Sequence, residues 1–550
     1  MAVKNPKIEL LEIKDFSGGL NTRQEVRSIA ANESPAMMNV NITDEGAVIT
    51  RFGYEEVCEL PAGTRTYGVI PFYKNTATAF KKLCIFGQDG KLYTISGSST
   101  TPVDNGSYTS SMTATETVRG SVLNSLLVFG NGTASTQKFD GTTISNITTY
   151  AVAAKNDIFS NWGGTGVSSG GTKMYGAGSS SAPTALYHSD TDNPDNWDTG
   201  GAGALNVSLN DGEQITGINP LDDTLVIFKY DHTFLGKLYL DSTSAISSIQ
   251  LSPARLPAGC VAPGSIALSG NDIIRLADPD TYGISALGFQ ASYFTQNQRN
   301  NSLSWKIQPT VRTINRENMS KAAGVYWQDR YILCAPTSTS SENDGCFVYS
   351  TTIDGRGYWT LWNDIPADSF AIFKDDNNRN ELYFGSNLEA KVFKFNTQFT
   401  DNGAGYRRSY RTKTFSLGDA KRVKKLHRFY IRGAINSSTE LTMRMVVDGV
   451  SQEYTIDRDY FEYDTAGNAM GDNIYGDELF GGLGGNGDVV TLTRFMYRDE
   501  PTLTISEGRE VYFEFENSAA GQAWKIDYIG LEYEYDTDEN YPMDLTSSPD

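Results

Sequence analysis

Short apolar runs separated by polar turns recur along most of this chain. From about residue 65 to about residue 400, each unit has a strongly apolar strand, a turn with Asn, Asp or Gly, and a second strand that ends in Tyr or Phe. Clear copies lie at 82–95, 123–141 and 223–239. Almost no segment has the 3.6-residue apolar period of an amphipathic helix. The pattern therefore predicts an all-β protein.

The spacing of these units favours one all-β architecture. Successive copies lie roughly 40–60 residues apart, which is the period of four-stranded propeller blades. We predict a β-propeller of about six or seven blades over residues 65–404. A pair of β-sandwiches has similar strand spacing and is the alternative, although a sandwich would not repeat the same unit so often.

The pattern changes after residue 404. Segments 441–449, 510–516 and 524–535 alternate apolar and polar residues, as half-buried strands do. They predict an antiparallel β-sandwich over residues 405–536 after the propeller, and then a polar tail at 537–550. A stretch rich in Gly, Asp and Tyr at about 457–495 interrupts the sandwich, and a loop of this length is usually functional or disordered.

Residues 1–64 form a distinct opening segment. Cap-like residues at 32–34, followed by Pro35, predict a short helix within 26–38. Residues 46–54 read as a strand that follows a turn.

Composition limits the classes of function. The 550 residues predict two or three domains, and the net charge of −20 argues against a protein that grips nucleic acid. That charge fits either simple solubility or an acidic channel wall that DNA passes without adhering. The N-terminus has no apolar signal region, and no run is long enough for a membrane helix, so we expect a soluble chain made in the cytoplasm.

The cysteines predict neither a disulfide framework nor a zinc site. Their number is odd, their spacings are wide, and no C-x-x-C pair occurs. Cys84 and Cys334 lie within apolar runs and read as small buried hydrophobic residues. We therefore expect folding in a reducing compartment. The five are Cys58, Cys84, Cys260, Cys334 and Cys346.

No catalytic, cofactor or metal site stands out. Residues 482–487 fit G-x-G-x-x-G, but a strand follows them where a dinucleotide site needs a helix. Residues 166–170 fit G-x-S-x-G without the α/β context of a hydrolase. The Asp-rich stretch 190–198 suits either Ca²⁺ binding or a polar turn with Asx hydrogen bonds. We expect no enzymatic activity and no cofactor.

A basic run contrasts with the acidic remainder of the chain. It suits either an acidic partner surface or a neighbouring subunit, or it consists of solvated positions that alternate along strands. Its members are Arg407, Arg408, Arg411, Lys421, Arg422, Lys424 and Lys425.

The opening segment carries a more specific pattern. Residues 14–21 (KDFSGGLN), 33–40 (ESPAMMNV) and 46–54 (GAVITRFGY) together resemble the opening of the nozzle proteins of short-tailed bacteriophages, also called tail tubular protein B or DNA-stabilisation proteins. Glycine pairs permit turns with positive φ, Asn can bridge backbone groups, and the Arg fork could tie the opening to the propeller. The motif residues are Gly18, Gly19, Asn39, Arg51 and Gly53.

The resemblance implies a structural protein of the virion tail, assembled in the bacterial cytoplasm. It implies a sixfold ring below the portal and adaptor proteins, next to tail fibres or spikes. Double-stranded DNA would leave through the lumen without sequence-specific binding, and a loop would retain it. Minor structural proteins of long-tailed phages have similar openings. The candidate channel or tip loop contains Gly481, Gly482, Gly484, Gly485 and Gly487.

Two other functions remain open from the sequence. In a propeller that binds carbohydrate or a host receptor, Trp162, Trp197 and Trp362 would be exposed at blade turns and stack on sugars. A propeller glycosidase or lyase would need paired carboxylates across a cleft.

Overall fold

The protein is all-β and divides into two compact units. The computed structural model describes residues 8–74, 80–97, 99–108, 116–133, 135–147, 158–163, 171–240, 246–254, 258–270, 272–287, 302–351, 357–396, 398–436, 439–456, 478–480, 490–502 and 504–535. One unit comprises residues 1–52 and 397–550, and the other comprises residues 53–396. Within the described residues there is one short α-helix, α1 (Gln308–Val311), and none is long and apolar enough to cross a membrane.

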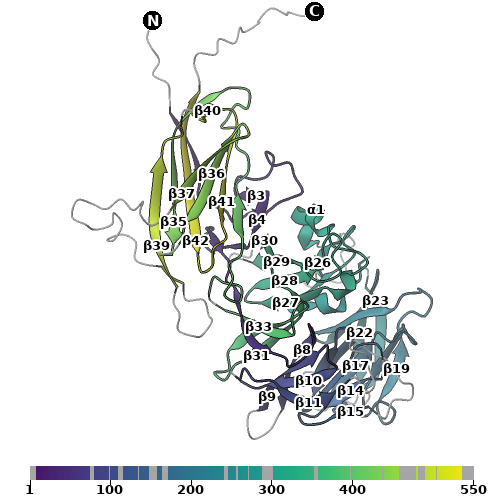
Figure 1. The fold of residues 1–550 in the computed structure, drawn as a ribbon. Coiled ribbons are helices and arrows are strands. Elements are labelled where there is room, and N and C mark those ends of the chain that lie inside the picture. Colours follow the sequence, from purple (N-terminus) through teal and green to yellow (C-terminus); the bar gives the residue numbers. More distant parts are fainter. Residues whose placement is uncertain are drawn as a thin grey trace, which may run out of the picture. The chain divides into compact units, whose positions relative to one another are not determined.

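The unit at residues 53–396 is a β-propeller (Figure 1). Its described strands form five antiparallel sheets of four strands and one of three, and β27–β30 form a further antiparallel group of four. The first three sheets are β8 (Thr66–Lys74), β9 (Phe80–Gly87), β10 (Lys91–Ile95) and β11 (Val103–Ser107); β12 (Arg119–Leu123), β13 (Leu126–Gly130), β14 (Gln137–Phe139) and β15 (Ile144–Asn146); and β16 (Ile158–Gly163), β17 (Thr172–Ala177), β18 (Ala185–His188) and β19 (Gly203–Asn206).

The remaining sheets follow in chain order. They are β20 (Ile215–Leu221), β21 (Thr224–Lys229), β22 (Thr233–Leu240) and β23 (Ile246–Pro253); β24 (Ala267–Ser269), β25 (Asp272–Leu276) and β26 (Ile284–Ala286); β27 (Ala323–Trp327), β28 (Arg330–Ala335), β29 (Gly345–Thr351) and β30 (Gly357–Asn363); and β31 (Ala367–Lys374), β32 (Asn380–Ser386), β33 (Lys391–Phe395) and β7 (Tyr54–Glu59).

The sheets close into a ring. First strands of neighbouring sheets lie side by side, as β12 does with β8 and β16, β16 with β20, and β27 with β24 and β31, and β31 of the last sheet lies beside β8 of the first. The fourth strand of the last sheet is β7, which precedes the first sheet in the chain and pairs with β33. The predicted propeller is therefore confirmed, with six complete blades and one three-stranded sheet. Its bounds are residues 53–396, not the predicted 65–404.

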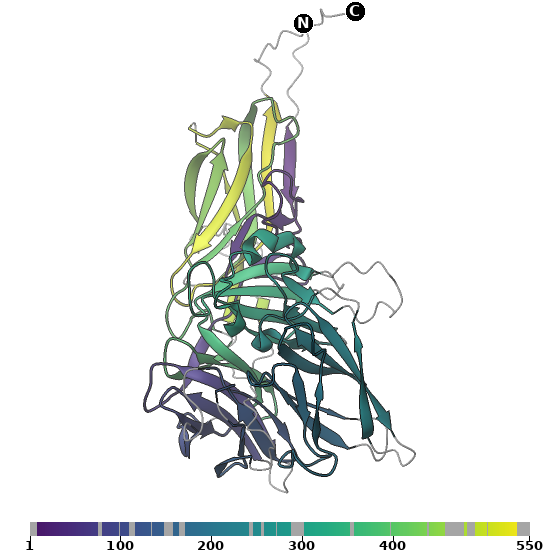
Figure 2. The ribbon, with the colours of Figure 1, turned by 90° about the vertical axis from the view of Figure 1, so that its right-hand side faces the viewer.

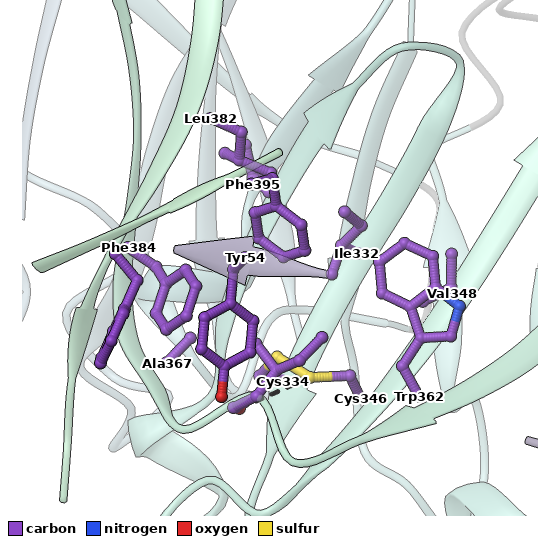
Figure 3. Packing of buried hydrophobic residues seen from close by; sticks show 13 residues of the cluster. Tyr54, Ile332, Cys334, Cys346, Val348, Trp362, Ala367, Leu382, Phe384 and Phe395 are labelled. Carbon is purple, nitrogen blue, oxygen red and sulfur yellow. Dashed lines mark hydrogen bonds between the residues drawn. A yellow bond between two sulfur atoms is a disulfide. The ribbon is translucent and has the colours of Figure 1, made fainter. Parts of the chain in front are cut away.

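The second strand of each blade explains the apolar runs in the sequence. Strand β21 is buried at every position, and β28 is buried at all but its first. Such a strand has partners on both sides within its own sheet and neighbouring blades on both faces, so it reads as a continuous apolar run. One core between two blades contains Tyr54, Trp362, Phe384 and Phe395 (Figure 3).

The second unit is the predicted antiparallel sandwich (Figure 2). One sheet has the order β38 (Glu478–Phe480), β39 (Val490–Asp499), β35 (Lys424–Ile435), β42 (Trp524–Tyr535), β6 (Val48–Thr50), β5 (Val40–Ile42), with β1 (Glu9–Ile13) also beside β42 and β40 (Glu507–Gly508) beside β35. The other has the order β4 (Ala36–Met38), β34 (Arg408–Arg411), β41 (Val511–Asn517), β36 (Leu441–Val447), β37 (Val450–Ile456).

Aromatic side chains hold the two sheets together. The ring of Phe429 on β35 lies 4.8 Å from Tyr454 on β37 and 6.5 Å from Phe513 on β41, measured between ring centroids. Strand β41 alternates buried and half-buried residues, as the period of two predicts.

The opening segment departs from the sequence prediction. It is not a separate domain, because β1, β5 and β6 belong to a sheet of the sandwich. Residues 26–38 contain no helix: β3 (Glu33–Ser34) pairs with β2 (Gly19–Leu20), and β4 pairs with β34. Pairing with these distant strands satisfies backbone groups that a helix would have satisfied locally.

One cysteine pair also departs from the prediction. Cys334 and Cys346 form a disulfide, with Cα atoms 4.1 Å apart, because the pairing of β28 with β29 places them directly opposite each other. Cys58, Cys84 and Cys260 are free and buried, as small hydrophobic residues would be. A separation of 12 residues in the sequence did not reveal the register that brings the pair together.

The proposed tip loop lies largely outside the described residues. Within the predicted stretch 457–495, the structure describes 478–480 and 490–495. Gly481, Gly482, Gly484, Gly485 and Gly487, and the predicted tail at 537–550, are not among the described residues.

Candidate functional site

The motif residue Arg51 lies at the centre of a buried polar junction in the sandwich unit. Its side chain is 0 % exposed, and its two terminal nitrogens donate to the carboxylate of Asp401 at 2.8 and 2.6 Å. Its Nε donates to Oδ1 of Asn39 at 2.8 Å. This is the two-pronged geometry in which a guanidinium matches a carboxylate.

Asn39 connects three parts of the junction. Its backbone has a φ of 55°, a left-handed conformation that Asn adopts more readily than most residues. Its Nδ2 donates to the carbonyl of Arg407 at 2.6 Å, and its own carbonyl accepts from the amide of Arg51 at 3.1 Å. The predicted bridging role of Asn39 is therefore what the structure shows.

The ring of Tyr406 packs against two guanidinium groups. The Cζ atoms of Arg51 and Arg408 lie 4.0 and 3.8 Å from its centroid, and its hydroxyl donates to the Arg51 carbonyl. Arg408 is also fully buried, and it donates to the carbonyls of Phe399 at 2.6 Å and Ala519 at 3.0 Å. Burial raises the pKa of the Tyr406 hydroxyl, although both arginines oppose that shift. The ring thus stays neutral between two charged groups.

The remaining motif residues lie elsewhere. Gly19 has a φ of 64°, which a glycine tolerates without strain, and a Cβ at Gly18 would lie 2.6 Å from the Glu33 side chain. Gly53 begins the propeller unit, where its carbonyl accepts from the amide of Asn396. The fork of Arg51 was predicted to tie the opening to the propeller, and it instead binds Asp401 of its own unit.

The basic run is largely paired within the chain. Arg407 binds Glu516 at 2.8 Å, and Arg411 lies 3.8 Å from Glu514 and over the ring of Tyr512. Arg408 is buried in the junction.

The second half of the basic run lies near the start of β35. Buried Lys424 donates to the carbonyls of Ser416, Asp419 and Arg509. Arg422 lies over the ring of Tyr535, and Lys421 is exposed. The register of Lys425 places it opposite Glu534.

Alternating charges cross one sheet of the sandwich. Arg411, Glu514, Arg444 and Glu453 stand opposite one another on β34, β41, β36 and β37. Opposite charges on directly facing strand positions stabilise a sheet. At Arg411 the structure therefore favours the strand interpretation of the basic run.

The Asp-rich stretch 190–198 is a polar turn. Asn193 and Asn196 accept hydrogen bonds from amides two or three residues further on, and Asp195 binds Lys138 at 2.5 Å. Among the described residues, no group of three or more His, Cys, Asp or Glu side chains is placed to hold a metal. The G-x-S-x-G residues 166–170 lie outside the described part of the chain.

The tryptophans predicted to stack on sugars are not exposed. Trp162, Trp197 and Trp362 are 3 %, 5 % and 4 % exposed, because their rings fill the cores between strands. Large aromatic rings bury more apolar surface than any other side chain, so blade cores recruit them. These three residues cannot form a sugar-binding platform on the surface of this fold.

Comparisons with known proteins bear on the fold alone. No family model and no curated protein matches this chain. Among solved structures, the Pan2 WD40 domain of Neurospora crassa is 10 % identical, with a TM-score of 0.34 over 62 % of this chain and 95 % of that one. YCF48 bound to D1 peptide is 9 % identical, with a TM-score of 0.33 over 62 % and 94 %.

A propeller enzyme is also among the similar structures. The exo-β-1,3-galactanase of Phanerochaete chrysosporium is 9 % identical, with a TM-score of 0.23 over 75 % of this chain and 95 % of that one. Likenesses this distant say nothing of activity or ligand.

The sequence alone does not mark two residues of the junction. Asp401 and Tyr406 follow the propeller in the chain, 350 and 355 residues from Arg51. A buried Arg needs a counter-charge, but the chain has 66 acidic residues, and none is marked as the partner.

Proposed function

We propose that this chain is a non-enzymatic structural protein of a bacteriophage tail, which forms the nozzle ring through which DNA leaves. The observation that carries the proposal is the position of the junction. The chain leaves the sandwich after Phe52 and returns to it by Phe399, whose rings lie 5.2 Å apart. Arg51 and Asp401 bind each other beside these two points.

The junction supports an architectural role for the motif. Asn39 and Arg51, which carry the resemblance to nozzle proteins, form hydrogen bonds with each other and with backbone carbonyls, and Arg51 also binds the carboxylate of Asp401. They fix the two chain ends between which the propeller is inserted. Chain ends that lie close together permit the insertion of a whole domain, and this arrangement suits an architectural protein.

The charge of the chain fits the proposed channel. With a net charge of −20, a ring of copies would repel the phosphates of DNA and let the duplex pass without adhering. The partners of such a ring are further copies of the chain, the portal and adaptor proteins above it, and tail fibres or spikes beside it.

Immunogold labelling of phage particles that encode this chain tests the proposal. Antibodies against the isolated chain should label the tail end remote from the capsid, and quantitative mass spectrometry should give about six copies per particle. Label on the capsid or on lateral fibres, or absence of the chain from purified particles, would contradict the proposed location.

A further inference from the structure

The ring of the propeller has a seam where its first and last blades meet. Strand β8 of the first blade lies beside β31 of the last. At the start of both strands lies a charged cluster. Arg65 directly precedes β8, Asp368 is the second residue of β31, and Glu342 lies in the connection between β28 and β29.

One guanidinium group joins three blades at this seam. Nη2 of Arg65 lies 3.1 Å from Oδ1 of Asp368 and 2.9 Å from Oε2 of Glu342. Arg65 thereby links the first blade to the last two. The pairing of β7 with β33 closes the ring through backbone hydrogen bonds, so this cluster is a second closure made by side chains.

Asp368 is poorly suited to carry a charge. Its side chain is 4 % exposed, and its Oδ2 is buried without a hydrogen-bond partner among the described residues. Burial raises the pKa of Asp368 to about 6, with Glu342 adding to the shift while Arg65 and Arg119 oppose it. A buried carboxyl with an unsatisfied oxygen favours the protonated form.

The neighbouring groups respond differently to pH. Burial raises the pKa of Glu342, but its bonds to Arg65 and Lys321 outweigh that effect and lower the pKa overall. Burial raises the pKa of Tyr67. Burial lowers the pKa of Arg65, but its hydrogen bond to Glu342 and its attraction to Asp368 outweigh that effect and raise the pKa overall. Glu342, Tyr67 and Arg65 therefore keep their charge states between pH 5 and 7.5. Arg119, Lys321 and Glu116 also face the cluster.

We propose that Arg65, Glu342 and Asp368 form a proton-sensitive clasp on the propeller seam, which tightens when Asp368 takes up a proton. Opening of the seam would expose Asp368 to water, where its carboxyl returns to an ordinary acidity. The closed state then binds the proton more tightly than the open state, so acidification favours closure. Arg65 stays paired with Glu342 when Asp368 becomes neutral.

The sign of the effect follows from proton linkage. The pKa of Asp368 is raised from 3.8 in the exposed carboxyl to about 6 in the closed seam. Between these two pKa values the closed seam binds more protons than the open seam, so the stability of the closed state falls as pH rises. Between pH 7.5 and pH 5 the seam should open about tenfold less often.

Hydrogen exchange of the full chain, measured by mass spectrometry at pH 5 and 7.5, tests the clasp. After correction for the intrinsic rate, peptides from β8 and β31 should show about tenfold greater protection at pH 5, relative to peptides from β20 and β21 of a distant blade. Asp368→Asn should abolish this difference. Asp375→Asn, in the turn at the opposite end of β31, should keep it.

Two results would overturn the proposal. One is equal corrected protection of β8 and β31 at both pH values in the unsubstituted protein, which decides the matter even if Asp368→Asn fails to fold. The other is a tenfold difference that persists in Asp368→Asn, since a different group would then be responsible. The test concerns the isolated chain and does not depend on its place in a particle.

Discussion

Arg51 and Asp401 form a buried ion pair within the sandwich unit, and its effect on stability depends on whether both partners are present. Both side chains are almost completely buried, and the guanidinium also binds Asn39 and the carbonyl of Phe52. Such a pair adds little net stability compared with apolar residues of the same shape, but loss of one partner leaves a buried charge without compensation.

Removal of the carboxylate should therefore be costly. We expect Asp401→Asn to lower the free energy of unfolding by about 3–5 kcal/mol, because Arg51 would remain charged and buried. Denaturant unfolding followed by tryptophan fluorescence measures the change. Glu516→Gln is the matched control, since Glu516 and its partners Arg407 and Arg444 are more exposed, and it should cost about 1 kcal/mol or less. Equal effects of the two variants would contradict the account.

The sequence indicated only part of this junction. The bridging amide of Asn39 follows from residue type and was foreseen, whereas its positive φ was not, and the fork of Arg51 was assigned to the propeller although it binds Asp401. Their partners were not foreseen, because contacts across 350 residues depend on the path of the whole chain. The exposure of Trp162, Trp197 and Trp362 was wrongly inferred for the same reason: position at a turn does not reveal what packs above it.

At the scale of elements, β7 completes the last blade and closes the ring. Its Tyr54 lies 5.1 Å from both Phe384 and Phe393, measured between ring centroids, and its hydroxyl donates to the carbonyl of Asp364 at 2.8 Å. Figure 3 shows the ring of Tyr54 inside this core, between the last blade and its neighbour.

Truncation of this anchor should weaken the ring. We expect Tyr54→Ala to destabilise the propeller by about 3–5 kcal/mol through lost burial and a cavity. Tyr54→Phe removes the hydrogen bond alone and should cost about 1 kcal/mol. Calorimetry of both variants gives the comparison, with Val103→Ala on exposed β11 as a neutral control. A small effect of Tyr54→Ala would mean that β7 does not help to close the ring.

The disulfide between β28 and β29 makes a separate prediction. Alkylation of the unfolded, unreduced protein should modify Cys58, Cys84 and Cys260 and leave Cys334 and Cys346 linked. Replacement of both linked cysteines by Ala should cost about 2–3 kcal/mol, because the cross-link restricts the unfolded chain. Alkylation of all five thiols would contradict the bond and restore the prediction of a reduced protein.

At the scale of the whole molecule, the propeller is an insertion in the sandwich. The sequence predicted both architectures from their strand patterns, but in sequential order, with residues 1–64 as a separate opening. Periodicity reports which residues of a strand are buried and not which distant strand lies beside it. For that reason the pairing of β1 and β6 with β42 could not be foreseen.

Deletion of residues 1–52 distinguishes an opening segment that is part of the sandwich from one that folds separately. The sandwich would lose β1, β5 and β6 from one sheet and β4 from the other, expose the edge of β42, and leave Asp401 without Arg51. We expect loss of the cooperative unfolding transition of this unit, or an insoluble product. If the opening were a separate domain, circular dichroism and calorimetry would show the C-terminal sandwich intact.

Cryo-electron microscopy of the particle that carries this chain tests the central claim most directly. The account predicts a ring of about six copies on the tail axis, below the portal and around DNA, with an inserted propeller in each copy. Density that projects sideways from the tail, or that occurs in threes at a fibre tip, would contradict the nozzle and assign the chain to receptor binding.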